Sequence, residues 1–256
     1  MDMLTPKNIL KRLLIALINR QISEENISMM FIIGHMRSGS TLLVHLLANH
    51  PMILGYGETH HNYQTVKDFG AVSYKILRKF NRYLPKEDYI LDKVLHEEKG
   101  LTSRLTKYKK TKVILLVREP ERSIKSILSL GLDKTSSEAK ALEYYKERLK
   151  TIEEFATRLS GDRCCFLTYE HLVENSLSTL KALTNFLNLS SPLKDKYESL
   201  WSTGIKGLGD SSDSIRTGKI TKAKKNINIA LSKNTIEEAN NAFDKCLQQC
   251  RTLSLV

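Results

Sequence analysis

The chain of 256 residues is long enough to bury a full core, and its size fits one large α/β domain. Its formal net charge of +12 suits an acidic ligand, a nucleic acid or an anionic membrane surface, but no run of like charges forms a separate basic tail. The four cysteines include no CxxC pair, and Cys164 and Cys165 would point to opposite faces of a strand, which argues against structural zinc. We therefore expect reduced core thiols and a cytoplasmic protein.

The start of the chain contains a short apolar run, Leu13–Ile18, with basic residues on both sides. The basic residues are Lys7, Lys11, Arg12 and Arg20. A membrane span needs about 20 apolar residues, so this run predicts no integral span. Basic flanks would suit a signal peptide or an interfacial helix, but no small-residue cleavage site follows. We predict that residues 1–27 form an amphipathic helix packed on a domain of residues 28–256, with peripheral membrane contact left open.

The sequence FIIGHMRSGSTLL, from Phe31 to Leu43, predicts a phosphate-binding loop. Apolar residues Met29–Ile33 predict a buried parallel strand, Gly34–Gly39 a tight loop, and Ser40 the start of a helix. A strand, a loop and a helix in this order direct backbone N–H groups and the positive end of a helix dipole at one point. Phosphate or sulfate binds at such a point.

This loop is close to the P-loop pattern of nucleotide triphosphatases but departs from it at one position. Gly34, Gly39 and Thr41 are in register with the pattern, whereas Ser40 stands where those enzymes have a lysine. The cation comes three residues earlier, as Arg37. The change argues against ordinary ATP chemistry. A linking Gly/Ser turn, with Arg37 in a surface ion pair, is the simpler alternative.

Two further strands are predicted to end in polar residues. Ile53–Gly57 leads to a polar cluster, and Tyr89–Asp92 ends at Lys93, before a predicted surface helix over Glu97–Tyr108. The cluster consists of Glu58, Thr59, His60 and His61. Open α/β sheets bind their ligands at such strand ends.

The clearest strand is Val113–Val117, which has only apolar residues, as a central parallel strand requires. Arg118 follows it directly, and Pro120 then starts a helix that carries Ser126. Nucleotide triphosphatases usually end a neighbouring strand with an aspartate that holds magnesium, whereas this strand ends in a cation. We predict a second anion site here and no metal, with helix capping or an internal ion pair as the alternative.

The remaining predicted elements complete an α/β domain. They are a helix over Ser136–Leu159 whose EEF and KER runs form a solvated face, a strand over Arg163–Thr168, helices over Leu172–Leu187 and Pro192–Trp201, a long loop over Gly204–Lys225 and a helix over Thr235–Cys250. A loop of that length inside a domain is often functional.

The two predicted anion sites together resemble those of the PAPS-dependent sulfotransferases, closest to the carbohydrate and tyrosylprotein branches. GHMRSGSTLL is similar to the loop that binds the 5'-phosphosulfate of 3'-phosphoadenosine-5'-phosphosulfate (PAPS). VREPERSIKS, with Arg118 and Ser126, is similar to the element that binds the 3'-phosphate. The resemblance implies the P-loop NTPase-like sulfotransferase fold, a single α/β domain with a central parallel β-sheet flanked by helices.

Three weaker similarities extend the resemblance. TYEHL resembles the family's YEDL segment, which implies that Tyr169 lies near the adenine. LDK implies that Lys93 lies near the acceptor, and IRTGK resembles a late loop that closes over the nucleotide. In that loop Thr217 replaces a lysine, so only Arg216 and Gly218 carry over.

The resemblance also implies catalytic roles. Arg37 would stabilise charge at the sulfuryl group. Backbone N–H groups from four loop residues would hold the 5'-phosphate: Ser38, Gly39, Ser40 and Thr41. Glu58 is the first choice as general base, and His60 is the second because a histidine titrates near neutrality. A plain polar contact is the alternative for both, and a surface or packing role is the alternative for Lys93 and Tyr169.

We therefore predict a sulfotransferase that moves a sulfuryl group from PAPS to a hydroxyl, or as second choice an amine, without a metal. The partner would be a small-molecule or carbohydrate acceptor and not a nucleic acid. Its pocket would come from Tyr56–Lys79, Gly131–Ser137 and Gly204–Ser214. A nucleotide or sugar kinase using ATP and magnesium is the first alternative, and a basic nucleic-acid-binding protein is the second. The acceptor's identity and the oligomeric state are not predicted.

Overall fold

A computed structural model of the chain describes residues 5–65, 67–96, 101, 105, 108, 110–205, 213–221 and 227–255. Its strands are β1 (Ser28–Gly34), β2 (Ile53–Leu54), β3 (Tyr89–Val94), β4 (Lys112–Val117) and β5 (Cys164–Thr168). Its helices are α1 (Pro6–Ser23), α2 (Ser40–Ala48), α3 (Asp68–Lys79), α5 (Pro120–Leu128), α6 (Glu138–Arg158), α7 (Tyr169–Glu174), α8 (Ser176–Phe186), α9 (Asp213–Arg216) and α10 (Lys233–Cys250), with 3-10 turns η1 (Asp133–Thr135) and η2 (Arg251–Leu253).

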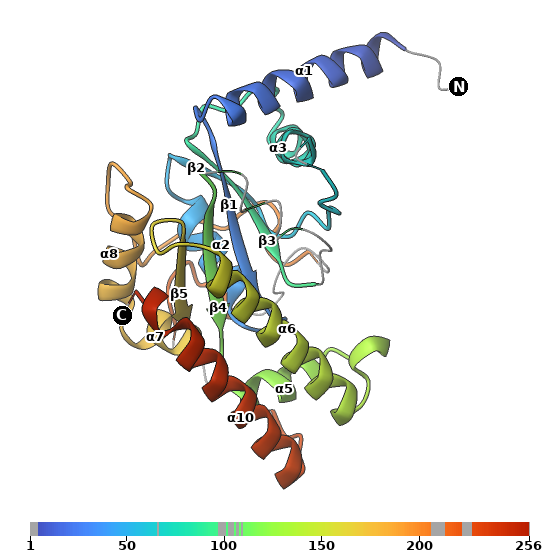
Figure 1. The fold of residues 1–256 in the computed structure, drawn as a ribbon, viewed down its shortest axis with the longest axis vertical. Coiled ribbons are helices and arrows are strands. Elements are labelled where there is room, and N and C mark those ends of the chain that lie inside the picture. The colour runs from blue at the N-terminus through green and yellow to red at the C-terminus, as the bar shows by residue number, and fades with distance from the viewer. Residues whose placement is uncertain are drawn as a thin grey trace.

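Five parallel strands form one sheet, in the order β2-β3-β1-β4-β5 (Figure 1). The chain builds β2 and β3 on one side of β1 and later adds β4 and β5 on the other. In open parallel sheets, ligands bind where the direction of winding reverses, outside the C-terminal ends of the strands. The predicted α/β fold is confirmed, and it directs attention to the ends of β1 and β4.

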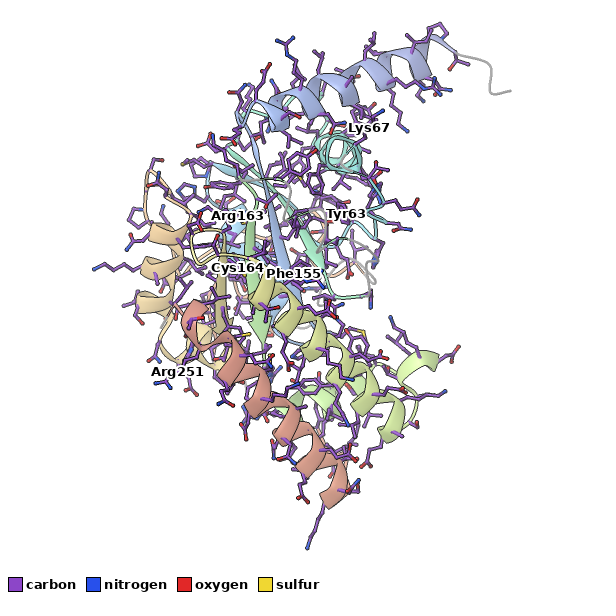
Figure 2. All side chains as sticks on the ribbon, viewed as in Figure 1. Tyr63, Lys67, Phe155, Arg163, Cys164 and Arg251 are labelled. Carbon is purple, nitrogen blue, oxygen red and sulfur yellow. The ribbon has the colours of Figure 1, made fainter. Side chains whose placement is uncertain are left out.

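Successive strand residues enter two separate cores, one on each face of the sheet. Phe31 belongs to one core and Ile32 to the other, because neighbours on a strand point to opposite sides. Cys164 and Cys165 divide in the same way, and all four cysteines are buried free thiols, as expected. Figure 2 labels Cys164 of β5 and Phe155 of α6, which belong to the same core.

The helices cover both faces of the sheet. Residues of α1, α3, α5, α6 and α10 enter the first core, and residues of α2, α7 and α8 enter the second. Figure 1 shows α6 and α10 running beside each other across the first face. Within the part of the chain that the structure describes, no helix is long and apolar enough to cross a membrane.

The starts of the long helices follow from capping residues. The side chains of Thr5, Ser137 and Ser232 each accept a hydrogen bond from a backbone N–H three residues later, at the starts of α1, α6 and α10. Pro120 is the first residue of α5, where its missing N–H costs nothing. Glu119 caps the same helix by accepting from the N–H of Arg122 (3.0 Å).

The predicted helix over Pro192–Trp201 is wrong. Leu193 and Tyr197 are buried at helical spacing, but the segment is not helical. Instead, the N–H of Tyr197 donates to the carbonyl of Gly218 (2.8 Å). Pairing with a distant segment satisfies this backbone, so apolar spacing alone was a misleading guide.

Three further predictions differ from the structure, and a fourth lies largely outside the described residues. The predicted helix Leu172–Leu187 is interrupted at Asn175, which separates α7 from α8. The predicted loop Gly204–Lys225 contains α9, and the predicted helix Glu97–Tyr108 falls almost entirely outside the described residues. Neither the EEF run nor the KER run of α6 forms a fully solvated face, because Glu153, Phe155 and Arg148 are buried, the last only 3% exposed.

Candidate active site

The loop after β1 has the conformation that its glycines suggested. Gly39 has φ +88° and immediately precedes α2, and Arg37 also has a positive φ, 67°. A side chain at Gly34 would lie 2.8 Å from the carbonyl oxygen of Leu116, so only glycine allows the loop to start this close to β4. The loop and the N-terminus of α2 therefore present backbone N–H groups at the ends of β1 and β4.

Tyr169 lies directly against this loop. A Cβ atom at Gly39 would lie 2.2 Å from Cδ2 of the Tyr169 ring. Arg118 contacts the same ring, because its guanidinium carbon lies 4.4 Å from the ring centroid. Arg118 Nη1 also donates to the carbonyl of Arg37 (3.3 Å). Residues from three strand ends thus meet at one point.

The two predicted anion-binding elements are in direct contact. Arg37 Nε donates to the hydroxyl oxygen of Ser126 (2.8 Å), which joins the loop to α5. Two buried polar atoms of these strand-end segments have no hydrogen-bond partner among the described residues, Ser38 Oγ and Arg118 Nε. Buried polar atoms are nearly always paired in folded proteins, so these two are suited to a polar ligand.

A buried neutral histidine joins the two strand ends beneath the loop. His35 Nε2 accepts from the N–H of Arg118 (3.1 Å), so Nδ1 carries the hydrogen and donates to the carbonyl of Met36 (2.8 Å). Burial lowers the pKa of His35 to about 4, and the charges of Arg148 and Arg118 act in the same direction. The Tyr145 hydroxyl fixes the same corner by donating to the carbonyl of Arg118 (2.8 Å).

Glu58 lies between two imidazoles at the neighbouring strand ends. It is 7% exposed, and its Oε1 lies 3.7 Å from His60 Nδ1 and 3.8 Å from His96 Nε2. The N–H of Leu95 donates to the same oxygen (3.3 Å). Burial lowers the pKa of His96. Of the two histidines, His60 was predicted here and His96 was not.

The Glu58 cluster is bound to the phosphate loop through α6. Tyr144 accepts from the N–H of Met36 (2.8 Å) and donates to the carbonyl of Leu95 (2.7 Å). Arg148 donates to the carbonyls of Gly34 (2.9 Å) and His96 (2.9 Å). These bonds hold the ends of β1 and β3 at a fixed separation, so the carboxylate and the loop belong to one site.

The cluster has a metal-like ligand set but cationic surroundings. One ligand atom from each of Glu58, His60 and His96 lies within 4.8 Å of the others, a set that a divalent cation accepts. However, Lys134 Nζ donates to His96 Nδ1 (2.9 Å), which leaves the hydrogen of the neutral ring on Nε2. Together with the buried guanidinium of Arg148, this ammonium opposes the binding of another cation.

Lys93 and its neighbour Asp92 are buried at the end of β3. Lys93 is 4% exposed, and its charge helps to lower the pKa of His45, which burial lowers most. Asp92 accepts from both the N–H (2.9 Å) and the hydroxyl (2.7 Å) of Thr59 and from the Tyr63 hydroxyl. Tyr63 is therefore a core residue. An acceptor-pocket role for it is not supported.

The rest of the predicted acceptor segment Tyr56–Lys79 is only partly a loop. Its second half is α3, in which Phe69 is fully buried. Trp201, in contrast, is 40% exposed, and its ring centroid lies 4.8 Å from that of Tyr56. Tyr56 is itself buried, so the accessible aromatic surface here is the Trp201 ring, which rests on Tyr56.

Gly218 lies against Tyr197, and Arg216 lies beside Gly204. Gly218 pairs with Tyr197, whose ring packs edge-on against His45 of α2 (5.2 Å between centroids). A side chain at Gly204 would lie 2.9 Å from Arg216 Nη2. Among the described residues, no contact joins Arg216 to the phosphate loop.

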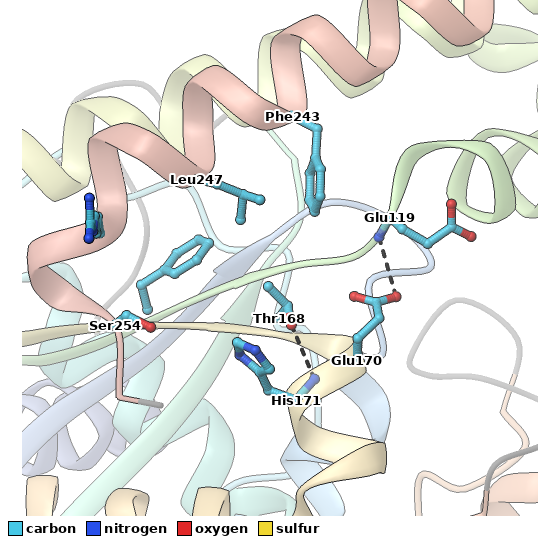
Figure 3. Close-up of a pocket in the computed structure, with 9 residues that line it drawn as sticks. Glu119, Thr168, Glu170, His171, Phe243, Leu247 and Ser254 are labelled. Carbon is cyan, nitrogen blue, oxygen red and sulfur yellow. Dashed lines mark hydrogen bonds between the residues drawn. The ribbon is translucent and has the colours of Figure 1, made fainter.

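A separate pocket of about 340 Å³ lies between the end of β5, α7 and α10 (Figure 3). Its lining residues are Glu119, Phe166, Thr168, Glu170, His171, Phe243, Leu247, Arg251 and Ser254. Figure 3 shows the Glu170 carboxylate accepting from the N–H of Glu119 (3.4 Å), and burial raises the pKa of that carboxyl. None of the predicted site residues lines this pocket.

Comparison with known proteins identifies the class. A sequence profile described as the sulfotransferase family matches residues 30–99 and 65–193, which together cover more than half of the chain. The chain belongs to the sulfotransferase family and is an enzyme of sulfuryl transfer. The sulfotransferase prediction is confirmed over the kinase alternative. A search of curated proteins finds no match.

Solved sulfotransferase structures have the same fold. The sulfotransferase domain from the curacin biosynthetic pathway is 20% identical, with a TM-score of 0.61 over 84% of this chain and 97% of that chain. Mouse sulfotransferase SULT7A1 complexed with PAP is 12% identical, with a TM-score of 0.56 over 93% and 90%. The sulfotransferase from Alicyclobacillus acidocaldarius is 13% identical, with a TM-score of 0.53 over 88% and 94%.

Two residues of this site, His96 and Arg148, were not predicted from the sequence. His96 lies two residues after the end of β3, and polar residues at strand ends had already singled out Glu58 and Lys93, so the same strand-end argument would have found it. Arg148 had no such signal. It lies in a charged helix, and only the tertiary structure turns it toward three strand-end carbonyls, those of Gly34, Val94 and His96.

Proposed function

We propose that this sulfotransferase uses PAPS as donor and a hydroxyl group as acceptor. The observation that carries the proposal is the joined pair of anion elements, in which Arg37 donates to Ser126 and Arg118 lies over Tyr169. A nucleotide with phosphates on both its 3' and 5' positions spans two such elements, whereas ATP carries all its phosphates on one side. That SULT7A1 was solved with PAP supports the same donor here.

The donor would lie across the loop and the start of α5. Backbone N–H groups from the loop would hold the 5'-phosphosulfate: those of Ser38, Gly39, Ser40 and Thr41. Arg118 and Ser126 would hold the 3'-phosphate, and binding would break the Arg37–Ser126 hydrogen bond so that Arg37 turns to the sulfuryl group. Tyr169 would border the adenine. Arg216 and Gly218 would close over the nucleotide.

The transfer itself needs no covalent intermediate. The acceptor oxygen attacks sulfur, the bond from sulfur to the 5'-phosphate oxygen breaks, and 3',5'-adenosine bisphosphate leaves. Glu58 would take the acceptor proton, with His60 as the alternative, and His96 would orient the carboxylate through its Nε2–H. Arg37 and Lys93 would stabilise the negative charge that develops on the sulfuryl and phosphate oxygens.

We further propose a small-molecule or carbohydrate acceptor, in line with the exposed Trp201 beside Tyr56. Stacking on an aromatic ring suits a sugar or another flat ligand. Residues 28–256 would form the catalytic domain, acting in the cytoplasm and without a nucleic-acid partner.

Thermal unfolding with three nucleotides tests the donor. Saturating 3',5'-adenosine bisphosphate should raise Tm by about 5 °C or more, and ATP with magnesium should not. Arg118→Ala should abolish most of the bisphosphate shift while sparing the smaller shift from 5'-AMP. Arg122→Ala is the matched control, since this arginine is exposed on α5, the helix that begins two residues after Arg118. Stabilisation by ATP–magnesium alone, or equal losses for both adenosine nucleotides, would overturn the assignment.

A further inference from the structure

The N-terminal helix carries an exposed apolar surface. Of the ten large hydrophobic side chains exposed in the described chain, four lie on α1: Ile9, Leu10, Leu13 and Leu17. Their exposed fractions are 44% to 59%. Single exposed apolar residues are ordinary in soluble proteins, but a contiguous group marks an interaction surface.

This surface is distinct from the face that α1 uses within the fold. Leu14, Ile18 and Ile22 are buried, and the helix packs on α3 through that side. At 100° per residue, the stripe through Ile9, Leu13 and Leu17 lies about 140° around the helix from the buried stripe. Figure 1 shows α1 projecting beyond the body of the domain, with its first turns away from the sheet.

The charge on α1 is entirely positive. The helix contains Lys7, Lys11, Arg12 and Arg20, all of them exposed, and no acidic residue. Arg20 pairs with Glu24 just after the helix (2.7 Å). The other three cations lie in the projecting half. At 100° per residue they lie about 100° or more around the helix from the stripe, so their charges remain in water when the stripe faces a surface. The whole chain adds a net charge of +12.

We propose that α1 is a membrane-docking helix for anionic lipid surfaces, with the stripe formed by Ile9, Leu10, Leu13 and Leu17 entering the headgroup boundary. An amphipathic helix with basic residues and no acidic ones binds such surfaces by combined apolar burial and charge attraction. A second copy of the chain fits less well. Two copies that each carry a net charge of +12 would repel one another.

Vesicle co-sedimentation of the full chain tests this surface. The protein should pellet with phosphatidylcholine vesicles containing about 30% phosphatidylserine, and at least about ten-fold less with phosphatidylcholine alone. Raising salt to about 0.5 M should weaken the binding because it screens the lipid charge. The double variant Leu13→Asp, Leu17→Asp should reduce binding by about ten-fold or more, since it removes both central leucines from the stripe.

The matched control is Leu177→Asp on α8, where the side chain is 76% exposed and far from α1 in the chain. It should bind vesicles like the unaltered protein. Equal losses in both variants, or equal pelleting with neutral and anionic vesicles, would overturn the proposal. So would a dimer in sedimentation equilibrium that the double variant dissociates while vesicle binding is absent. Neither variant touches the nucleotide loop, so donor binding and activity in solution should be unchanged.

Discussion

Glu58 is held in a way that suits a proton acceptor. It is nearly buried, two imidazoles lie just under 4 Å away, and among the described residues one backbone N–H, from Leu95, donates to it. A carboxylate in such surroundings keeps lone pairs free for an incoming hydroxyl. Bonds from α6 fix the phosphate loop and the backbone of Leu95 and His96, and the N–H of Leu95 in turn donates to the carboxylate, which favours a preorganised site.

Replacing Glu58 by Gln should lower kcat by about 100-fold or more, because the amide keeps the shape but cannot accept the proton. Binding of 3',5'-adenosine bisphosphate should change little. The measurement is steady-state sulfuryl transfer from PAPS together with nucleotide titration. Glu153→Gln is a control of similar burial, since Glu153 pairs with Lys245 (3.1 Å) on the far side of α6. Near-normal turnover of the Glu58 variant would transfer the role of base to His60.

Arginines illustrate what sequence can and cannot reveal at this scale. Arg37 and Arg118 lie in short motifs that follow predicted strands, so the neighbouring residues in the sequence indicate a site. Arg148 stands in a helix rich in charge, and its burial comes from an encounter with strand ends more than fifty residues away in the chain. No local pattern encodes such an encounter.

The contact between the loop after β1 and α7 is the most constrained junction between elements. Gly39 combines a positive φ with a ring 2.2 Å from where a side chain would begin. Both conditions exclude any other residue without rearrangement. The Tyr169 ring can therefore lie against the loop only because Gly39 has no side chain.

Gly39→Ala should therefore displace the Tyr169 ring and weaken binding of 3',5'-adenosine bisphosphate by about ten-fold or more. Gly131→Ala is a control that separates the effect of the positive φ from the effect of the ring contact. Gly131 also has a positive φ, 62°, but a side chain there would meet nothing within 4 Å. It should lose only about 1 kcal/mol of stability, from the backbone. Nucleotide titration and urea unfolding of both variants provide the measurement, and matching behaviour would show that the ring contact is unimportant.

Strands were easier to predict than the connections between them. β1, β4 and β5 are continuous apolar runs because both of their faces are buried, and this leaves a clear mark in the sequence. The segment before Trp201 has apolar residues four apart for another reason, since Tyr197 pairs with Gly218 and packs on His45. The spacing of apolar residues does not distinguish a buried helix face from an irregular segment that packs against distant residues.

On the scale of the whole molecule, buried histidines make stability depend on pH. His35 has a pKa of about 4 in the folded state, against an ordinary value of 6.5. Between pH 4 and pH 6.5, His35 is protonated in the unfolded chain but neutral in the folded chain. Stability from this group is therefore complete above about pH 6.5 and falls as the pH decreases toward 4, by about 3 kcal/mol.

His35→Gln should remove that part of the pH dependence, because glutamine does not titrate. Urea unfolding between pH 4 and 7 would measure it, as the difference in slope between the variant and the unaltered protein. His61→Gln, at a partly exposed histidine, is the control. An unchanged slope in the His35 variant would mean that other groups account for the acid sensitivity.

The contact of Gly39 with Tyr169 also bears on the order in which the protein becomes functional. The two residues are about 130 positions apart, and Tyr169 follows the last strand of the sheet. During synthesis the loop emerges early, but its aromatic wall cannot form until β5 has joined β4. A growing chain would thus hold an incomplete nucleotide site for most of its elongation, and donor binding would begin only once the sheet is finished.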